Sequence, residues 1–165
     1  MKNKIKKYIK EIFIFIIFMT IFANALSLYR STELNKIQLP LDSVTLLDNI
    51  KYELPKNKAI MLYFWGSWCP VCKVEAGNIQ RVSKKYEVLT IALKSGSDNE
   101  INNYLKENNL DFKVINDDNG YLTSKFNISV FPTTIIYDKD KKVVFSDVGY
   151  TSTWGLYLRM WWASF

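Results

Sequence analysis

The chain is organised around the stretch Trp68-Cys69-Pro70-Val71-Cys72, which contains its only two cysteines. An uncharged apolar run at 59–65 precedes this stretch, and helical apolar spacing follows it. A cysteine where a strand passes into a helix lies near unpaired backbone N–H groups and the positive end of the helix dipole, which favour thiolate. Cys72 falls about one turn later, within reach of a disulfide. The stretch therefore predicts redox exchange.

A cysteine pair has uses other than redox exchange. Structural zinc needs four ligands, and the sequence has no histidine and no third cysteine. A structural disulfide across two residues would remove little chain entropy and stabilise the fold poorly. A thiolate pair can also bind Cu(I), with a methionine as a further ligand. The copper-binding module stays open as the alternative that is not an enzyme.

The composition predicts one globular domain and gives no sign of nucleic-acid binding. The chain has 165 residues, of which 48% are hydrophobic, and a net charge of +6. The first 30 residues hold six of the 22 basic residues and one of the 16 acidic residues, which leaves 16 basic and 15 acidic residues beyond them. The globular part is therefore nearly neutral, and we expect no nucleic acid to bind. We also expect no resident metal and no cofactor, with the Cu(I) module as the alternative.

The N-terminus predicts a membrane-targeting segment. Lysines precede an uncharged apolar stretch at 12–29, whose length is close to the lower limit for a span. Ala23-Asn24-Ala25 has the form of a signal-peptidase site. We favour an uncleaved single-pass anchor over a cleaved signal. Basic residues ahead of the span keep the N-terminus in the cytoplasm, which places the domain in the oxidising periplasm, outside the inner membrane.

The sequence divides into an anchor or signal at 1–30, a polar tether at 31–38 and a domain at 39–165. In the domain, apolar runs alternate with helical patterns, as in an α/β fold with parallel strands. The expected elements are a peripheral hairpin at 44–47 and 51–54, strands at 59–65, 88–93 and 112–115, helices between and after these strands, and a second hairpin at 133–137 and 142–145. Ser97 and Glu100 have the spacing of a capping box, and Asp118 is the expected cap of the next helix.

Two predicted helices have stripes of apolar residues that bear on function or packing. Glu75 lies on the stripe that Cys72, Ala76, Ile79 and Val82 share, where burial would raise its carboxyl pKa and suit it to proton transfer with Cys72. The opposite possibility is a glutamate that turns to solvent. The last stripe is expected to pack into the core, with a membrane or partner surface as the alternative, and consists of Trp154, Leu158, Trp161, Trp162 and Phe165.

Two motifs carry a family resemblance: Phe64-Trp65-Gly66-Ser67-Trp68-Cys69-Pro70-Val71-Cys72 and, about sixty residues later, Phe131-Pro132-Thr133-Thr134. Together they resemble the thioredoxin-like fold, a mixed central sheet flanked by helices. With Glu75 and the ending 148–156, the chain is similar to the TlpA-like branch, and within it to the ScsD-type oxidoreductases associated with copper tolerance.

The resemblance implies roles for individual residues. Cys69 would be the exposed nucleophile, and Cys72 the resolving thiol, with Glu75 as its proton-transfer group. Pro132 would be a cis-proline that shapes the substrate groove. The substrate-binding residues would be Trp68, Pro70, Phe131 and Pro132.

Three departures from the family pattern bear on function. Tyr63 stands where thioredoxins place a buried Asp, which passes the proton-transfer role to Glu75. Gly77 stands where TlpA-like proteins usually have a proline. Strong oxidases have a histidine between the cysteines, whereas this chain has Pro70-Val71 and so lacks a donor that would hold the thiolate. Because a less stable thiolate favours a reducing potential, we expect a reductase of protein disulfides, recharged by a membrane thiol-electron donor, with an oxidase as the alternative.

Overall fold

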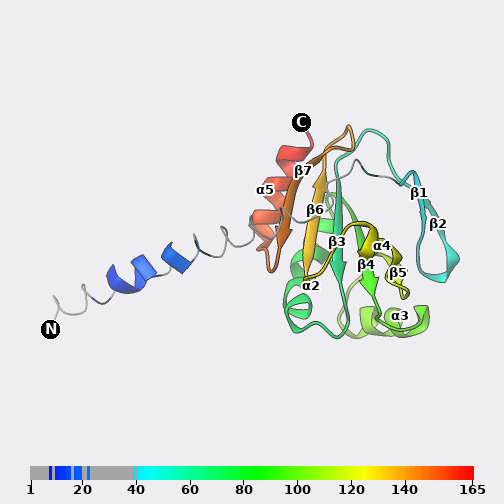
Figure 1. The fold of residues 1–165 in the computed structure, drawn as a ribbon, viewed down its shortest axis with the longest axis horizontal. Helices are drawn as coiled ribbons and strands as arrows, with labels where there is room; N and C mark the ends of the chain where they lie inside the picture. Colours follow the sequence, from blue (N-terminus) through cyan, green and yellow to red (C-terminus); the bar gives the residue numbers. More distant parts are fainter. Residues whose placement is uncertain (1–7, 9, 16, 20–21, 23–38, 40) are drawn as a thin grey trace.

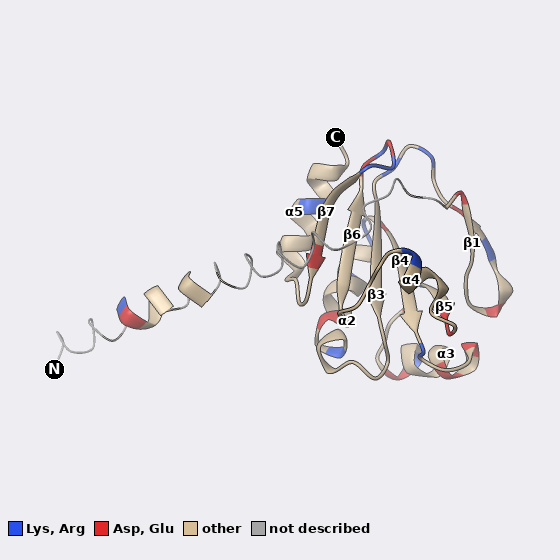
Figure 2. Ribbon diagram, viewed as in Figure 1, with Lys and Arg blue, Asp and Glu red and all other residues tan. Residues whose placement is uncertain are grey.

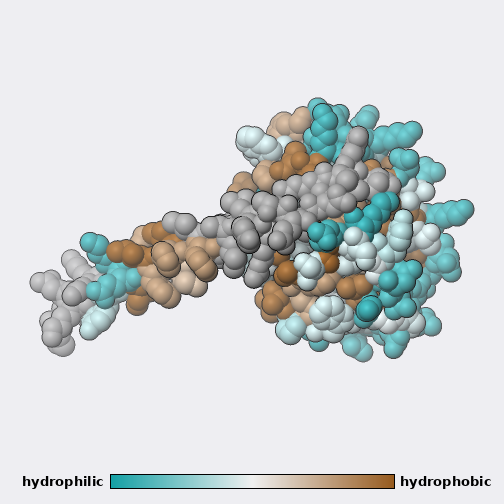
Figure 3. Space-filling model, viewed as in Figure 1, coloured by the Kyte–Doolittle hydropathy of each residue, from teal (hydrophilic) through white to brown (hydrophobic). Residues whose placement is uncertain are grey.

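The computed structural model describes residues 8, 10–15, 17–19, 22, 39 and 41–165. The predicted cleavage site at 23–25 and the predicted tether at 31–38 lie outside these residues. The described part of the apolar segment is helical and forms a hydrophobic run in Figure 3. Within the described residues, no helix combines the length and the hydropathy that a bilayer crossing requires.

The centre of the domain is a five-stranded mixed sheet in the order β5-β4-β3-β6-β7 (Figure 1). The central strand β3 pairs in parallel with β4, which pairs in parallel with β5, whereas β6 and β7 are antiparallel to their neighbours. The predicted strands and the predicted second hairpin are confirmed. The bounds are β3 Ile60–Trp65, β4 Glu87–Leu93, β5 Lys113–Asp117, β6 Thr133–Tyr137 and β7 Val143–Val148.

The side chains of β3 divide the core into two halves. Met61, Tyr63 and Trp65 belong to the half that also contains residues of α2 Pro70–Ser83, α3 Asp98–Glu107 and α5 Thr153–Ala163. Ile60, Leu62 and Phe64 belong to the half beneath the antiparallel hairpin of β1 Ser43–Thr45 and β2 Lys51–Glu53, which a short 3-10 helix at Leu47–Asn49 joins. Every residue of β3 is buried, as expected of a strand covered on both faces.

The starts of two helices test the capping predictions. The capping box of Ser97 and Glu100 is confirmed at the start of α3. The predicted cap of the next helix, Asp118, is wrong. That helix is α4 Tyr121–Lys125, and the buried carboxylate of Asp117 accepts hydrogen bonds from the backbone N–H groups of Leu122 (3.0 Å) and Thr123 (2.8 Å). Asp117 ends β5 with its side chain facing inward, so it reaches the helix where the exposed Asp118 does not.

The predicted core stripe of the C-terminal helix is also wrong. Trp154, Leu158, Trp161, Trp162 and Phe165 are exposed, and α5 instead buries Leu156, Met160 and Ala163. Both sets have helical spacing, so periodicity identified the helix but not its inner face. The side that packs beside α2 and β6 carries the smaller and more flexible side chains.

We expect the replacement Asp117→Ala to lower the free energy of unfolding by about 2 kcal/mol, because it leaves buried backbone donors of α4 without an acceptor. The matched control Asp118→Ala removes an exposed carboxylate and should change the free energy by less than about 0.5 kcal/mol. Urea unfolding of both variants measures the difference. Equal effects would contradict the assignment of the cap to Asp117.

Candidate active site

The cysteine pair lies where β3 ends and α2 begins. Cys69 is the N-cap residue of α2, and its amide donates to the carbonyl of Gly66 (3.1 Å). Its sulfur accepts a hydrogen bond from the backbone N–H of Cys72 at 3.2 Å. The two cysteines form a disulfide with their Cα atoms 5.3 Å apart. The first sulfur therefore occupies the helix N-terminus that the sequence predicted, where backbone donors and the helix dipole favour a thiolate.

The accessibility of the cysteines differs from the expectation. Cys69 is 4% exposed and Cys72 is 1% exposed, so the implied exposed Cys69 is wrong for this oxidised state. Their neighbours Trp68, Pro70 and Val71 are exposed instead. The two sulfurs are bonded to each other and lie in the core cluster of β3 and α2. The side chains around the disulfide therefore face solvent in their place, and we call these side chains the rim. A partner sulfur has to approach through this rim.

Trp68 and Phe131 form part of the rim. The Trp68 indole donates to the carbonyl of Leu93 (3.1 Å), and its ring meets Phe131 edge-on with centroids 5.5 Å apart. The peptide bond between Phe131 and Pro132 is cis, as the resemblance implies, and Pro132 is buried. The Pro132 carbonyl accepts from the backbone N–H of Gly149 (2.8 Å). The loop that carries Trp68 and the loop that carries Phe131 are thus far apart in the sequence but in contact beside the disulfide.

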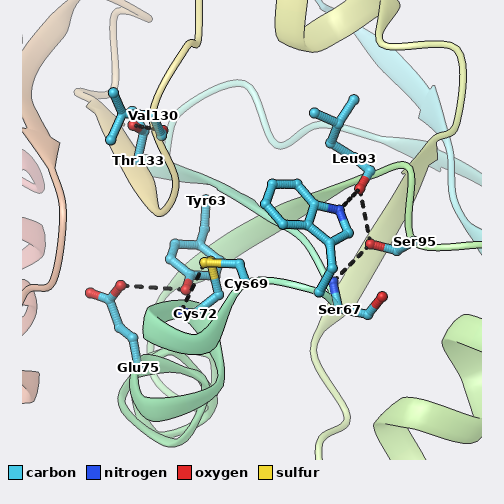
Figure 4. The surroundings of a disulfide bond; sticks show 10 residues. Tyr63, Ser67, Cys69, Cys72, Glu75, Leu93, Ser95, Val130 and Thr133 are labelled. Atoms are coloured by element: carbon cyan, nitrogen blue, oxygen red, sulfur yellow. Dashed lines mark hydrogen bonds between the residues drawn. A yellow bond between two sulfur atoms is a disulfide. The ribbon is translucent and has the colours of Figure 1, made fainter.

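Glu75 lies inside the protein beneath the cysteine pair. It is fully buried, and its carboxylate accepts a hydrogen bond from the backbone N–H of Thr151 (2.8 Å) and another from the Tyr63 hydroxyl (3.3 Å). Figure 4 shows Glu75 and the Tyr63 hydroxyl directed toward each other beside the disulfide. Burial raises the pKa of Glu75 to about 7, although the two hydrogen bonds favour the charged form. The carboxyl group can therefore gain and lose a proton near neutral pH.

Asn78 fixes the loop that reaches Glu75. Its side-chain amide donates to the carbonyl of Thr151 and the hydroxyl of Tyr150, both at 3.1 Å, and its oxygen accepts from the Thr153 hydroxyl (2.8 Å). Asn78 lies one turn after Glu75 on α2. No sequence pattern points to Asn78 or to the backbone of Thr151, because their bonds join α2 to a loop more than seventy residues away.

Comparisons with known proteins place the chain in a family. The pattern of the AhpC/TSA family matches residues 35–146. The chain is also 37% identical over 113 residues to the "Thioredoxin-like protein" of Haemophilus influenzae, an alignment that covers 68% of this chain and 67% of that protein. The chain belongs to the AhpC/TSA family.

Other relatives of this AhpC/TSA family member indicate its enzyme class. It is 35% identical over 107 residues to the thiol-disulfide oxidoreductase ResA of Bacillus thuringiensis subsp. konkukian, covering 61% of this chain and 62% of ResA. Among solved structures, the pneumococcal exposed lipoprotein thioredoxin of Streptococcus pneumoniae is similar, with a TM-score of 0.61 and 25% identity over 72% of this chain and 96% of that one. The fold is thioredoxin-like, and the chain is a thiol-disulfide oxidoreductase family enzyme.

The residues singled out in the sequence of this AhpC/TSA family member lie around one site. Trp68, Pro70 and Phe131 form the rim, with Pro132 buried behind them, and Cys69, Cys72 and Glu75 lie within. Tyr63, singled out only as a departure from the thioredoxin pattern, is a hydrogen-bond partner of Glu75. The alternation along β3 indicates this contact, because Tyr63 faces the half of the core that includes α2.

Glu75 makes the stability of the oxidised protein depend on pH. Because its pKa is raised from 4.5 to about 7, its contribution is fully favourable below pH 4.5 and is lost as the pH rises through 7. We expect Glu75→Gln to unfold with a free energy up to about 3 kcal/mol above that of wild type at pH 8, and with no such gain at pH 4.

Denaturant unfolding at the two pH values measures this effect. The control Glu107→Gln alters an exposed glutamate of α3 and should show no such pH dependence. A Glu75→Gln effect of the same size at both pH values would contradict the raised pKa.

Gly66 is required by the position of the Trp68 ring. A Cβ atom at Gly66 would lie 2.6 Å from the Cε2 and Nε1 atoms of Trp68, closer than real Cβ contacts. We expect Gly66→Ala to displace the indole from the carbonyl of Leu93 and to raise the KM for a protein disulfide. The control Gly77→Ala places its Cβ no closer than 3.9 Å to Arg81 Nη1. Near-ultraviolet circular dichroism reports the ring, and an unchanged spectrum and KM for Gly66→Ala would refute the prediction.

Proposed function

We propose that this protein is an extracytoplasmic thiol:disulfide reductase that exchanges electrons with protein disulfides through Cys69 and Cys72. The observation that carries the proposal is the disulfide at the N-terminus of α2 with the buried carboxyl group of Glu75 beneath it. This arrangement supplies a thiolate-stabilising position for one sulfur and a proton acceptor near the other. Membership in the thiol-disulfide oxidoreductases supports the same chemistry.

The proposed reaction has two displacement steps. The thiolate of reduced Cys69 attacks one sulfur of the substrate disulfide and forms a mixed disulfide, while the other substrate sulfur leaves as a thiolate and takes up a proton. The Cys72 thiol then gives its proton to the Glu75 carboxylate and attacks the Cys69 sulfur. The second substrate sulfur leaves as a thiolate. The substrate gains two electrons, and the enzyme is left with the Cys69–Cys72 disulfide.

The reducing direction rests on the surroundings of Cys69. The hydrogen bond given to its sulfur comes from the neutral backbone N–H of Cys72, and the intervening residues Pro70 and Val71 carry no charge. Because no histidine or charged side chain between the cysteines adds to these backbone contributions, the thiolate is less stable than in a strong oxidase, and the dithiol is a better electron donor. An oxidase remains the second candidate within the same chemistry, and a Cu(I)-binding module without exchange activity remains the alternative of another class.

The rim of Trp68, Pro70 and Phe131, with Pro132 buried behind it, is the proposed docking site for the substrate. Exposed Trp68 and Pro70 present apolar surface beside the disulfide, and aromatic residues are favourable anchors for protein partners. Because the edge-on contact with Phe131 and the hydrogen bond to Leu93 fix the Trp68 ring, little side-chain freedom remains to be lost on docking.

The proposed location is the periplasmic side of the inner membrane, with residues 12–29 as a single-pass anchor. The lysine-rich start and the apolar stretch support it. A membrane thiol-electron donor would then return the Cys69–Cys72 disulfide to the dithiol after each cycle. The ScsD-type assignment and the link to copper tolerance stay predictions from the sequence resemblance.

The reductase proposal is tested by the reduction of insulin with dithiothreitol as the electron source. Wild type should accelerate the reaction, and Cys69→Ser should fall to the uncatalysed rate because the attacking sulfur is lost. Cys72→Ser should accumulate a mixed disulfide between Cys69 and the substrate, visible by non-reducing mass spectrometry. Equal rates for wild type and Cys69→Ser would refute the proposal, and stoichiometric Cu(I) binding without exchange would favour the copper module.

A further inference from the structure

The outward side of α5 is an apolar surface with no cover from the described residues. Five apolar side chains on α5 and just after it are between 53% and 79% exposed, and we call them the α5 outer face. They are Trp154, Leu158, Trp161, Trp162 and Phe165. At 100° per residue, these five positions span an arc of about 100° around the helix axis. The arc lies opposite the buried Leu156, Met160 and Ala163. The helix is therefore apolar on two opposite sides.

Charge is kept away from the α5 outer face. All of α5 is described, and its only charged residue, Arg159, turns toward the sheet. There its guanidinium Nε lies 2.9 Å from Asp147 Oδ2, and its Nη2 donates to Asp147 Oδ1 at 3.0 Å. Contiguous apolar surface of this kind on a soluble domain marks an interaction site. An indole has an apolar ring and one polar N–H, so three indoles favour a contact at the boundary between an apolar phase and water.

A lysine-rich surface lies at the same end of the domain as the C-terminal end of α5 (Figure 2). The ammonium of Lys141 donates to the carbonyls of Pro55 (2.6 Å) and Lys58 (3.0 Å), so the β6–β7 turn and the loop before β3 lie side by side. Figure 2 shows their lysines at the end of the domain where α5 finishes. We define the lysine end as these loops, whose exposed lysines are Lys56, Lys58, Lys139 and Lys142, accompanied by Asp138 and Asp140.

We propose that the α5 outer face lies in the headgroup region of an anionic lipid bilayer, with the lysine end against the lipid phosphates. Tryptophan and phenylalanine are enriched where hydrocarbon meets water, and lysines near the surface attract anionic lipid. A second copy of the chain fits less well, because pairing two such ends would bring like charges together. The surface is distinct from the disulfide rim, which lies at the opposite end of β3 from the lysine end (Figure 1).

The start of the domain is compatible with this placement. The backbone N–H of Leu39 donates to the carbonyl of Lys141 at the lysine end (3.1 Å). Nine residues at 30–38 separate Tyr29, the end of the proposed anchor, from Leu39 in the sequence, and the ten Cα-to-Cα steps between the two span at most about 36 Å. This step rests on the proposed anchor, since an anchor at 12–29 would hold the lysine end within that distance of the bilayer. The contact itself rests on α5 and the lysines.

Tryptophan fluorescence of the full chain tests the proposal in vesicles that contain phosphatidylglycerol and brominated phosphatidylcholine. Three of the five tryptophans lie on the α5 outer face, and the variant W154F/W161F/W162F gives the background of the other two. We expect bromine to quench the signal above this background and soluble iodide to leave it largely intact. Leu158→Glu should remove most of the bromine quenching, because it places a charge in the contact.

The control Ile50→Glu adds the same charge at an equally exposed apolar site on the β1–β2 side of the domain and should leave the bromine quenching unchanged. Circular dichroism and insulin reduction confirm that both variants fold. Iodide quenching without bromine quenching would overturn the proposal. Protection from both quenchers together with cross-links between copies would also overturn it, because that result indicates a dimer face. Release of the chain by alkaline carbonate, scored after the quenching, would refute the anchor separately.

Discussion

The burial of one carboxyl group beneath the Cys69–Cys72 disulfide is the constraint on which the site depends. Glu75 is held by the Tyr63 hydroxyl of the central strand and by the Thr151 amide of the loop before α5. Burial of a charge is unfavourable unless its oxygens are hydrogen-bonded. The protein meets this need only partly, which leaves the pKa of Glu75 at about 7. The same incomplete compensation that weakens the fold at high pH suits the carboxyl group to proton transfer.

This constraint links parts of the fold that are remote in sequence. Asn78 orders the loop that carries Thr151, and that loop leads directly into α5. The neighbouring carbonyl of Pro132 accepts from Gly149, just ahead of the loop, so the rim beside the disulfide and the Thr151 amide that donates to Glu75 share one support. The packing of α5 beside α2 closes this half of the core. The same loop therefore bonds Glu75 and leads into the helix that packs beside α2.

The sequence predicted the features that follow from local pattern. The uncharged run of β3, the capping box of Ser97 and the hairpin of β6 and β7 each depend on residues close together in the chain. It failed where a choice depended on distant contacts. The face of α5 could not be chosen, because Trp161 and Met160 both continue an apolar stripe. The cap of α4 required the direction of the Asp117 side chain, and the partners of Glu75 required the loop at Thr151.

The equilibrium of the full-length protein with glutathione buffers decides whether Cys69 and Cys72 form the reducing redox couple that we propose. After alkylation of free thiols, mass spectrometry gives the oxidised fraction at each ratio of reduced to oxidised glutathione. We expect one two-electron transition with a potential near that of thioredoxin, about −270 mV, rather than near that of DsbA, about −120 mV. A potential near the DsbA value, or two thiols that do not titrate as one couple, would contradict it.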